Sequence, residues 1–121
     1  MKKALITGMN GFVGKYLQKA LKAQGYQVAG TYLPEHNLHA MGAHYYPADA
    51  SNMEQIEEVI QFYQPDEIYH LADSEIVFDN NKIGNEINKK ELENLINATG
   101  MHCPKCKIII VQLDSETDVL N

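Results

Sequence analysis

Three glycines at three-residue spacing, Gly8, Gly11 and Gly14, stand where a short apolar segment gives way to a helical pattern. Gly8 would allow a tight turn, Gly11 would let the backbone approach a pyrophosphate, and Gly14 would let the helix pack closely on a sheet. The amides and the positive dipole end of that helix would then hold the anion. The loop therefore predicts dinucleotide binding. The alternative is a tight strand-to-helix connection without a ligand.

The elements that would position this loop alternate along the chain. We expect strands over residues 3–7, 27–32, 43–46, 67–71 and 107–113, and helices over 12–24, 51–63 and 85–100. Ser51 with Glu54 three residues later forms a capping box at the start of the second helix. The alternation predicts an α/β fold with a Rossmann-like, doubly wound parallel sheet, strand order 3-2-1-4-5 and helices on both faces.

Apolar residues at helical spacing give the buried stripe expected for each helix. The first stripe is Phe12, Val13, Tyr16, Leu17, Ala20 and Leu21, the second is Met53, Ile56, Val59, Ile60 and Tyr63, and the third is Ile87, Leu92, Leu95 and Ile96. The polar stretch 73–84 is the segment we expect to be a mobile loop. We see no linker or repeat, so we expect a single domain over residues 1–121.

Composition excludes several classes of function. The 121 residues carry a formal charge of −6 and include no arginine, which disfavours a nucleic-acid partner. No apolar run approaches the roughly 18 residues that a membrane span requires, so we expect a soluble cytoplasmic protein without a membrane partner.

The loop and several later segments together resemble one enzyme family. The segments are ITGMNGFVG (6–14), PADA (47–50), PDEIYHLA (65–72), EIN (86–88) and NLI (94–96), in that order. The chain resembles the extended short-chain dehydrogenases that act on nucleotide sugars, namely NAD(P)-dependent epimerases, 4,6-dehydratases and 4-ketoreductases. The resemblance covers about the first half of that family's pattern.

The resemblance implies NAD or NADP as cofactor and implies the residues that hold it. These are Gly8, Asn10, Gly11, Phe12, Val13 and Gly14 in the loop, Tyr32 at the ribose, Asp49 and Ala50 at the adenine, and Leu71 and Ala72 along the pyrophosphate and nicotinamide ribose. An alternative for Asp49 is an acid that starts the following helix. His70 fits a packed strand residue better than a catalytic base. Glu35 and the lack of arginine slightly favour NAD.

Some positions depart from the family's pattern. Asp73 stands where the family has a small residue, and a carboxylate there would repel a pyrophosphate. Lys89, Lys90 and Glu91 place charge on the helix that commonly forms the family's dimer, so we expect a monomer or a different dimer.

Catalytic groups are sparse in this sequence. Ser115, with Thr117 as a fallback, matches the family's catalytic serine or threonine by position alone. No tyrosine has a lysine four residues later, so the Tyr-x-x-x-Lys pair that moves the proton is missing. We expect a cofactor-binding module that meets a nucleotide-sugar substrate only when a further part completes it. The alternatives are a scaffold that no longer binds cofactor and an oxidoreductase subunit completed by another chain.

The spacing of His102, Cys103 and Cys106 resembles half of a zinc site, and that of the two cysteines resembles a redox dithiol. No second pair completes four ligands, and this motif follows a helix instead of opening one. His36, His39 and His44 cluster in the expected loop and at its junction with the third expected strand. We therefore expect two ordinary reduced cysteines and no metal.

Overall fold

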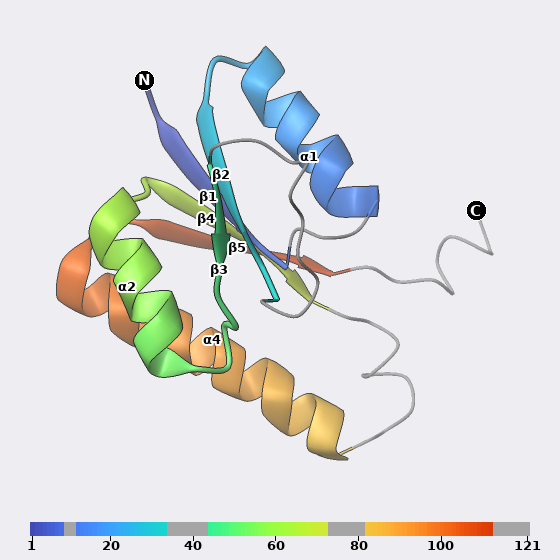
Figure 1. Cartoon of the computed structure of the whole chain (residues 1–121), viewed down its shortest axis with the longest axis vertical. Coiled ribbons are helices and arrows are strands. Elements are labelled where there is room, and N and C mark those ends of the chain that lie inside the picture. The colour runs from blue at the N-terminus through green and yellow to red at the C-terminus, as the bar shows by residue number, and fades with distance from the viewer. Residues whose placement is uncertain (9–11, 34–43, 73–81, 113–121) are drawn as a thin grey trace.

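A computed structural model describes residues 1–8, 12–33, 44–72 and 82–112 of the chain (Figure 1). Its strands are β1 (Lys3–Thr7), β2 (Gln27–Tyr32), β3 (Tyr45–Pro47), β4 (Glu67–Ala72) and β5 (Lys107–Gln112), and its helices are α1 (Phe12–Ala23), α2 (Met53–Tyr63) and α4 (Lys82–His102).

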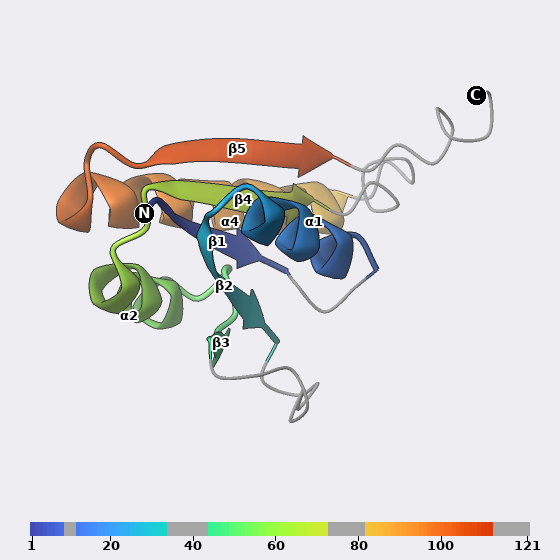
Figure 2. The ribbon, with the colours of Figure 1, turned by 90° about the horizontal axis from the view of Figure 1, so that it is seen from above.

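The strands form one parallel sheet in the order β3-β2-β1-β4-β5. Figure 2 shows the strands fanning from β5 to β3 as the sheet twists. The predicted Rossmann-like α/β class and the strand order 3-2-1-4-5 are confirmed.

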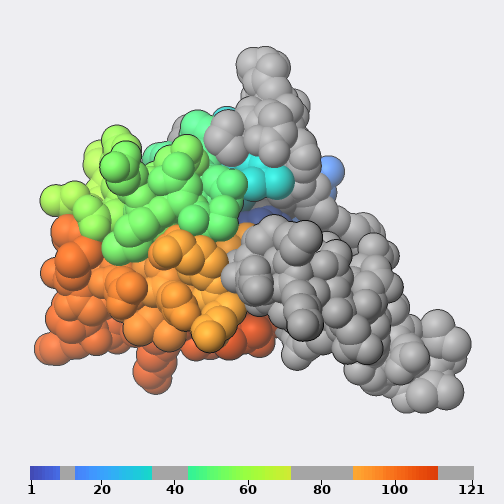
Figure 3. Space-filling model, turned by 90° about the horizontal axis from the view of Figure 1, so that it is seen from below, coloured from blue at the N-terminus to red at the C-terminus, as the bar shows by residue number. Residues whose placement is uncertain are grey.

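Helices cover both faces of the sheet, as predicted (Figure 1). On one face Leu17 and Leu21 of α1 pack with Ala4, Ile6 and Val28. The other face is covered by α2 and α4, which lie side by side in Figure 3. The core on that face consists of Leu5, Ala29, Ala48, Ala50, Ile56, Val59, Ile60, Tyr63, Ile68, Leu95 and Ala98.

The stripe predicted for α1 is correct at Leu17 and Leu21 and wrong at Tyr16, whose exposed fraction is 70%. The inward face repeats at Gly14, Leu17 and Leu21, which places Tyr16 on the solvent side of the helix. The helix ends in a Schellman motif, because the amide of Tyr26 donates to the Leu21 carbonyl and Gly25 adopts a φ of 90°.

The capping box predicted for α2 is wrong. Asn52 is the N-cap, and its side chain accepts a hydrogen bond from the amide of Gln55. Ser51 is drawn away from the cap position because its amide and its hydroxyl both donate to Asp49 Oδ1. The predicted buried stripe of α2 is confirmed: Ile56, Val59, Ile60 and Tyr63 are buried, and Met53 packs against them.

The third helix is longer than predicted. It includes residues 82–84, which the sequence placed in a loop; residues 73–81 of that loop lie outside the described part. It also passes Gly100 and ends at His102, because the residue before Pro104 is sterically disfavoured in a helix. Ile96 is 53% exposed, contrary to prediction, since the inward face is formed by Asn94, Leu95, Ala98 and Thr99.

The predicted ends of two strands also differ slightly. The third strand begins at Tyr45, two residues later than predicted, and includes Pro47. Proline has no amide hydrogen to donate, and β3 tolerates it because it is an edge strand, where no further strand needs that donor. The fourth strand extends one residue further, to Ala72. No helix in the described ranges is both long and apolar enough to cross a membrane.

Candidate functional site

The carboxyl ends of β1 and β4 bring predicted site residues together. Thr7 pairs with His70 in the register of the two strands, so Gly8 and Leu71 follow at the same edge. A Cβ on Gly8 would lie 3.5 Å from the Leu71 carbonyl oxygen. Two segments that are 63 residues apart in the sequence therefore meet at the edge where parallel α/β sheets bind ligands.

Gly8 has the backbone conformation that the predicted tight turn requires. Its φ is 75°, a left-handed conformation that side chains disfavour. Phe12 begins α1 directly after the loop, Val13 is half-buried, and Gly14 is buried, which fits the expected close packing of the helix on the sheet. Asn10 and Gly11 lie outside the described residues.

Asp49 already has a structural role at the start of α2. Its Oδ1 accepts from the amide of Ser51 at 2.9 Å and from the Ser51 hydroxyl at 2.7 Å. Its own amide donates to Gln55 Oε1 at 2.8 Å. The alternative weighed for Asp49, an acid that helps to start a helix, thus describes part of what this residue does.

Ala50 is held from beneath by the neighbouring helix. Its carbonyl accepts a hydrogen bond of 2.9 Å from the side-chain amide of Asn94, whose exposed fraction is 2%. The sequence contributed Asn94 to the family resemblance without giving it a role. A buried polar residue among apolar ones in a helix is the signal that could have suggested one.

His70 is buried in β4, as expected for a packed strand residue. Its Nδ1 lies 2.7 Å from Thr7 Oγ1, and its Nε2 lies 3.5 Å from Glu91 Oε1 of α4. Burial lowers the pKa of His70, so the neutral imidazole is favoured. The sequence indicated neither contact, because alternation along a strand gives the face of a residue and not its partner.

The remaining predicted residues are partly described. Tyr32 ends β2 and is half-buried, Leu71 is half-buried, and Ala72 ends β4. Glu35, Asp73, Ser115 and Thr117 lie outside the described residues, and so do His36 and His39. The catalytic position assigned to Ser115 therefore stays a prediction.

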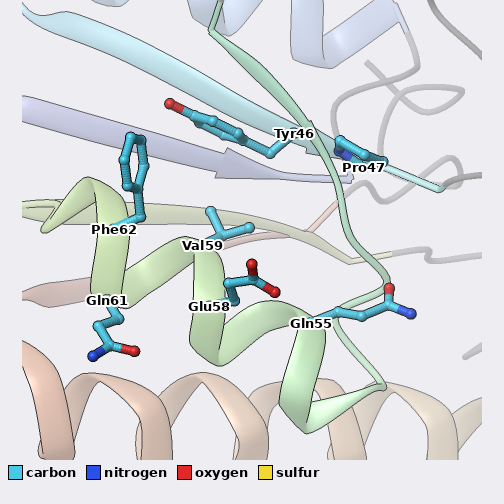
Figure 4. Close-up of a pocket in the computed structure, with 7 residues that line it drawn as sticks. All are labelled: Tyr46, Pro47, Gln55, Glu58, Val59, Gln61 and Phe62. Carbon is cyan, nitrogen blue, oxygen red and sulfur yellow. The ribbon is translucent and has the colours of Figure 1, made fainter.

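A groove of about 670 Å³ lies elsewhere, between β3 and α2. In Figure 4, Val59 and Phe62 point toward Tyr46, whose ring makes an edge contact with Phe62 at a centroid distance of 6.1 Å. Its lining residues are Tyr46, Pro47, Gln55, Glu58, Val59, Gln61 and Phe62. Because this lining is largely apolar and its one charged residue is an acid, the groove does not suit a pyrophosphate.

The Cys-x-x-Cys motif lies at the opposite edge, in the turn between α4 and β5. Both cysteines are free and half-buried. Burial raises the pKa of Cys103, and burial together with Cys103 raises that of Cys106 to about 12, which leaves little reactive thiolate. Across the described ranges, no three His, Cys, Asp or Glu side chains gather in a way that could hold a metal.

Known proteins resemble both the sequence and the fold. GDP-mannose 4,6-dehydratase of Yersinia enterocolitica is 35% identical over 86 residues, which is 60% of this chain and 23% of that enzyme. UDP-glucose 4-epimerase of Brucella ovis, solved in complex with NAD, superposes with a TM-score of 0.73 at 21% identity. The superposition covers 91% of this chain and 35% of the epimerase. L-threonine dehydrogenase of Clostridium difficile gives a TM-score of 0.71 at 25% identity, over 91% of this chain and 36% of the dehydrogenase.

This chain thus spans about a quarter of the dehydratase and about a third of the solved enzymes. The model of the NAD dependent epimerase/dehydratase family matches residues 4–111, from β1 nearly to the end of β5. The chain therefore belongs to the NAD dependent epimerase/dehydratase family, of which it represents the amino-terminal part.

Proposed function

We propose that this chain binds a nicotinamide dinucleotide, NAD in preference to NADP, at the carboxyl edge of its sheet. The observation that carries the proposal is the positive φ of Gly8, which follows β1 directly. A Cβ at this position would lie 3.5 Å from the Leu71 carbonyl oxygen. The NAD complex of the Brucella ovis epimerase supports it by likeness of fold. The amino end of α1, which begins at Phe12, offers a helix dipole for the diphosphate.

In this proposal each group of predicted residues contacts a different part of the cofactor. The loop from Gly8 to Gly14 and the start of α1 hold the pyrophosphate. Both hydrogen bonds of Ser51 use Oδ1 of Asp49, so the proposal assigns Oδ2 to the adenine amino group and the Ala50 backbone to the ring. Tyr32 lies at the ribose, and the backbone of Leu71 and Ala72 passes the nicotinamide ribose.

The preference for NAD is part of the proposal. The chain contains no arginine to pair with the 2′-phosphate of NADP. Its formal charge of −6 adds no attraction for that further anionic group.

Any reaction belongs to a larger assembly in this proposal. NAD supplies a hydride acceptor, whereas the chain has no Tyr-x-x-x-Lys pair for the accompanying proton. A nucleotide-sugar epimerase or dehydratase activity would require a further part that brings this pair and the sugar pocket. We propose a cytoplasmic protein with a single domain over residues 1–121, as a monomer or a dimer unlike the family's.

Calorimetric titration with NAD and NADP tests cofactor binding. We expect the wild type to bind NAD more tightly than NADP, and Gly11→Leu to lose binding with its fold retained, since a side chain there blocks the close approach of the backbone. Gly100→Ala is the matched control, because a Cβ on this exposed glycine of α4 meets nothing within 4 Å.

Absence of heat and of a thermal shift at millimolar NAD would overturn the proposal. Equal behaviour of the wild type and Gly11→Leu would support the alternative of a scaffold that has lost its ligand.

A further inference from the structure

Three polar side chains from three elements form a buried polar network beneath the candidate site. Glu91 of α4 faces His70 of β4 at 3.5 Å, and His70 faces Thr7 of β1 at 2.7 Å. The residues Thr7 and His70 have exposed fractions of 0% and 4%, and the Glu91 side chain is 21% exposed. All three lie on the face of the sheet that α2 and α4 cover.

The carboxylate of Glu91 decides which way hydrogen bonds run through this network. A neutral imidazole carries one hydrogen and one lone pair, and the acidic neighbour decides which nitrogen keeps the hydrogen. Glu91 lies on the Nε2 side, and Nε2 is enclosed without a hydrogen-bond partner. At 3.5 Å the carboxylate acts mainly through its charge, which favours hydrogen on Nε2. Nδ1 then keeps its lone pair and accepts the Thr7 hydroxyl.

The bond to Thr7 fixes the point where the loop begins. Thr7 is the last residue of β1, and the next residue is Gly8 with its φ of 75°. The carbonyl oxygen of Leu71, directly after His70, would lie 3.5 Å from a Cβ placed on Gly8. In the other tautomer Nδ1 would donate to Thr7, and the buried hydroxyl hydrogen would need a new acceptor.

We infer that Glu91 is a positioning residue for the cofactor loop: it holds His70 in the tautomer with hydrogen on Nε2, and through His70 it keeps Thr7 at the start of the turn. Asn94, three residues further along α4, donates directly to the carbonyl of Ala50. One face of α4 thus supports both the glycine turn and the segment assigned to the adenine. The effect on affinity rests on the proposed function, whereas the tautomer does not.

The tautomer is measured by long-range proton–nitrogen NMR of the histidine side chains in the cofactor-free protein. We expect hydrogen on Nε2 of His70 in the wild type and a shift toward a tautomer mixture in Glu91→Ala. Glu93→Ala is the matched control, because it removes the same charge from an exposed position of the same helix. An unchanged His70 spectrum in Glu91→Ala overturns the inference, whether or not the protein binds NAD.

Two amide variants of His70 test the link to the loop. In His70→Asn the amide oxygen takes the place of Nδ1 and keeps an acceptor for Thr7, whereas in His70→Gln the amide takes the place of Nε2 and keeps a partner for Glu91. We expect the Kd for NAD to stay within about twofold in His70→Asn and to rise about tenfold in His70→Gln and Thr7→Val, the factor for a lost buried hydrogen bond.

Denaturant midpoints of these variants are measured alongside the Kd. Equal loss of affinity in His70→Asn and His70→Gln would indicate a merely structural histidine and overturn the positioning role. A wild type that binds no NAD would remove the proposed function, and the NMR result would still decide whether Glu91 sets the tautomer of His70.

Discussion

The two ends of the sheet are built from different interactions. At the amino end two carboxylates have nearby donors: Asp66 Oδ2 accepts from the Lys3 backbone amide at 2.8 Å, and Glu67 Oε2 lies 3.7 Å from Lys2 Nζ. At the carboxyl end buried polar side chains hold the backbone, as Asn94 does at the carbonyl of Ala50. The first arrangement joins strand ends, while the second supports segments that turn outward.

This difference shows where a ligand can gain affinity. The amino end also has a hollow, of about 300 Å³, but its lining of Met1, Lys2, Asp66, Glu67, Lys105 and Lys107 mixes both charges, which interact with each other. The carboxyl end is less conspicuous, yet Thr7, which ends β1 there, is held by His70 without any ligand. A preorganised backbone reduces the cost of ordering the site on binding. Under the proposed function, the size of a hollow is therefore a poor guide to the cofactor site.

Glu67→Ala should give the largest loss of stability and leave cofactor binding unchanged. The Glu67 side chain is 11% exposed, and its carboxylate accepts a hydrogen bond of 2.8 Å from the Tyr69 hydroxyl. Its loss should cost about 2 kcal/mol, as expected for a charged hydrogen-bond acceptor in a buried site. Urea denaturation gives the free energy of unfolding, and NAD titration gives the affinity.

Lys2→Ala is the control for the amino end. The lysine side chain is 64% exposed, so its ion pair with Glu67 should contribute less than about 1 kcal/mol. A weaker affinity for NAD in Glu67→Ala would contradict the division of roles between the two ends.

Gly8→Ala and Gly25→Ala form a matched pair across the two ends. Both glycines have positive φ, 75° and 90°, and neither lacks space for a Cβ. Each substitution should cost about 1 to 2 kcal/mol through backbone strain. Only Gly8→Ala should weaken NAD binding, because only Gly8 lies in the loop. Equal affinities in the two variants, measured by calorimetry, would remove the cofactor role from the turn.

Asn52→Ala separates helix stability from ligand binding within the carboxyl end. Losing the N-cap of α2 should cost about 1 kcal/mol, whereas the affinity for NAD should not change. Ser51→Ala keeps the cap and should cost less, although it removes one hydrogen bond to Asp49. Thermal melts of both variants show which substitution costs more stability. A larger loss in Ser51→Ala would restore the capping box that the sequence suggested.

The sequence predicted the fold well because the fold depends on periodicity. Strand β2 and the sheet order followed from apolar runs alternating with helical patterns. It failed at Tyr16 and Ile96, because an apolar side chain beside a helix's buried stripe looks the same as one within it. Only packing against the sheet decides which of them is covered.

The candidate site was predicted in outline and not in its supports. Gly8 and Leu71 follow paired residues of β1 and β4 at the carboxyl edge of the sheet, as the predicted strand order requires, and their role at a cofactor stays a prediction. The contacts of Thr7, Glu91 and Asn94 were not predicted. Thr7 and His70 are 63 positions apart, Asn94 and Ala50 are 44 apart, and Glu91 reaches His70 from a different element. Glu91 was interpreted as a surface charge unfavourable to a dimer, although its carboxylate is directed at His70. Spacing along a chain does not reveal such tertiary partners.

The smallest effect should appear in the dependence of stability on pH. Burial lowers the pKa of His70 from its ordinary 6.5, so the unfolded chain takes up this proton first as pH falls. The free energy of unfolding should therefore decline below pH 6.5, moderated by the neighbouring carboxylate of Glu91. Urea midpoints across this range should fall in the wild type and flatten in His70→Asn.

The amino end responds in a different pH window. Burial by itself raises the pKa of Glu67, but hydrogen bonds from Tyr69 and Tyr26 and two nearby lysines outweigh it, so the net pKa lies below 4.5. The stability from this carboxylate is present above pH 4.5 and is lost as pH falls through the lowered pKa. Glu67→Gln should change only that lower window. If His70→Asn kept the decline that starts at 6.5, the carboxyl end would not be its source.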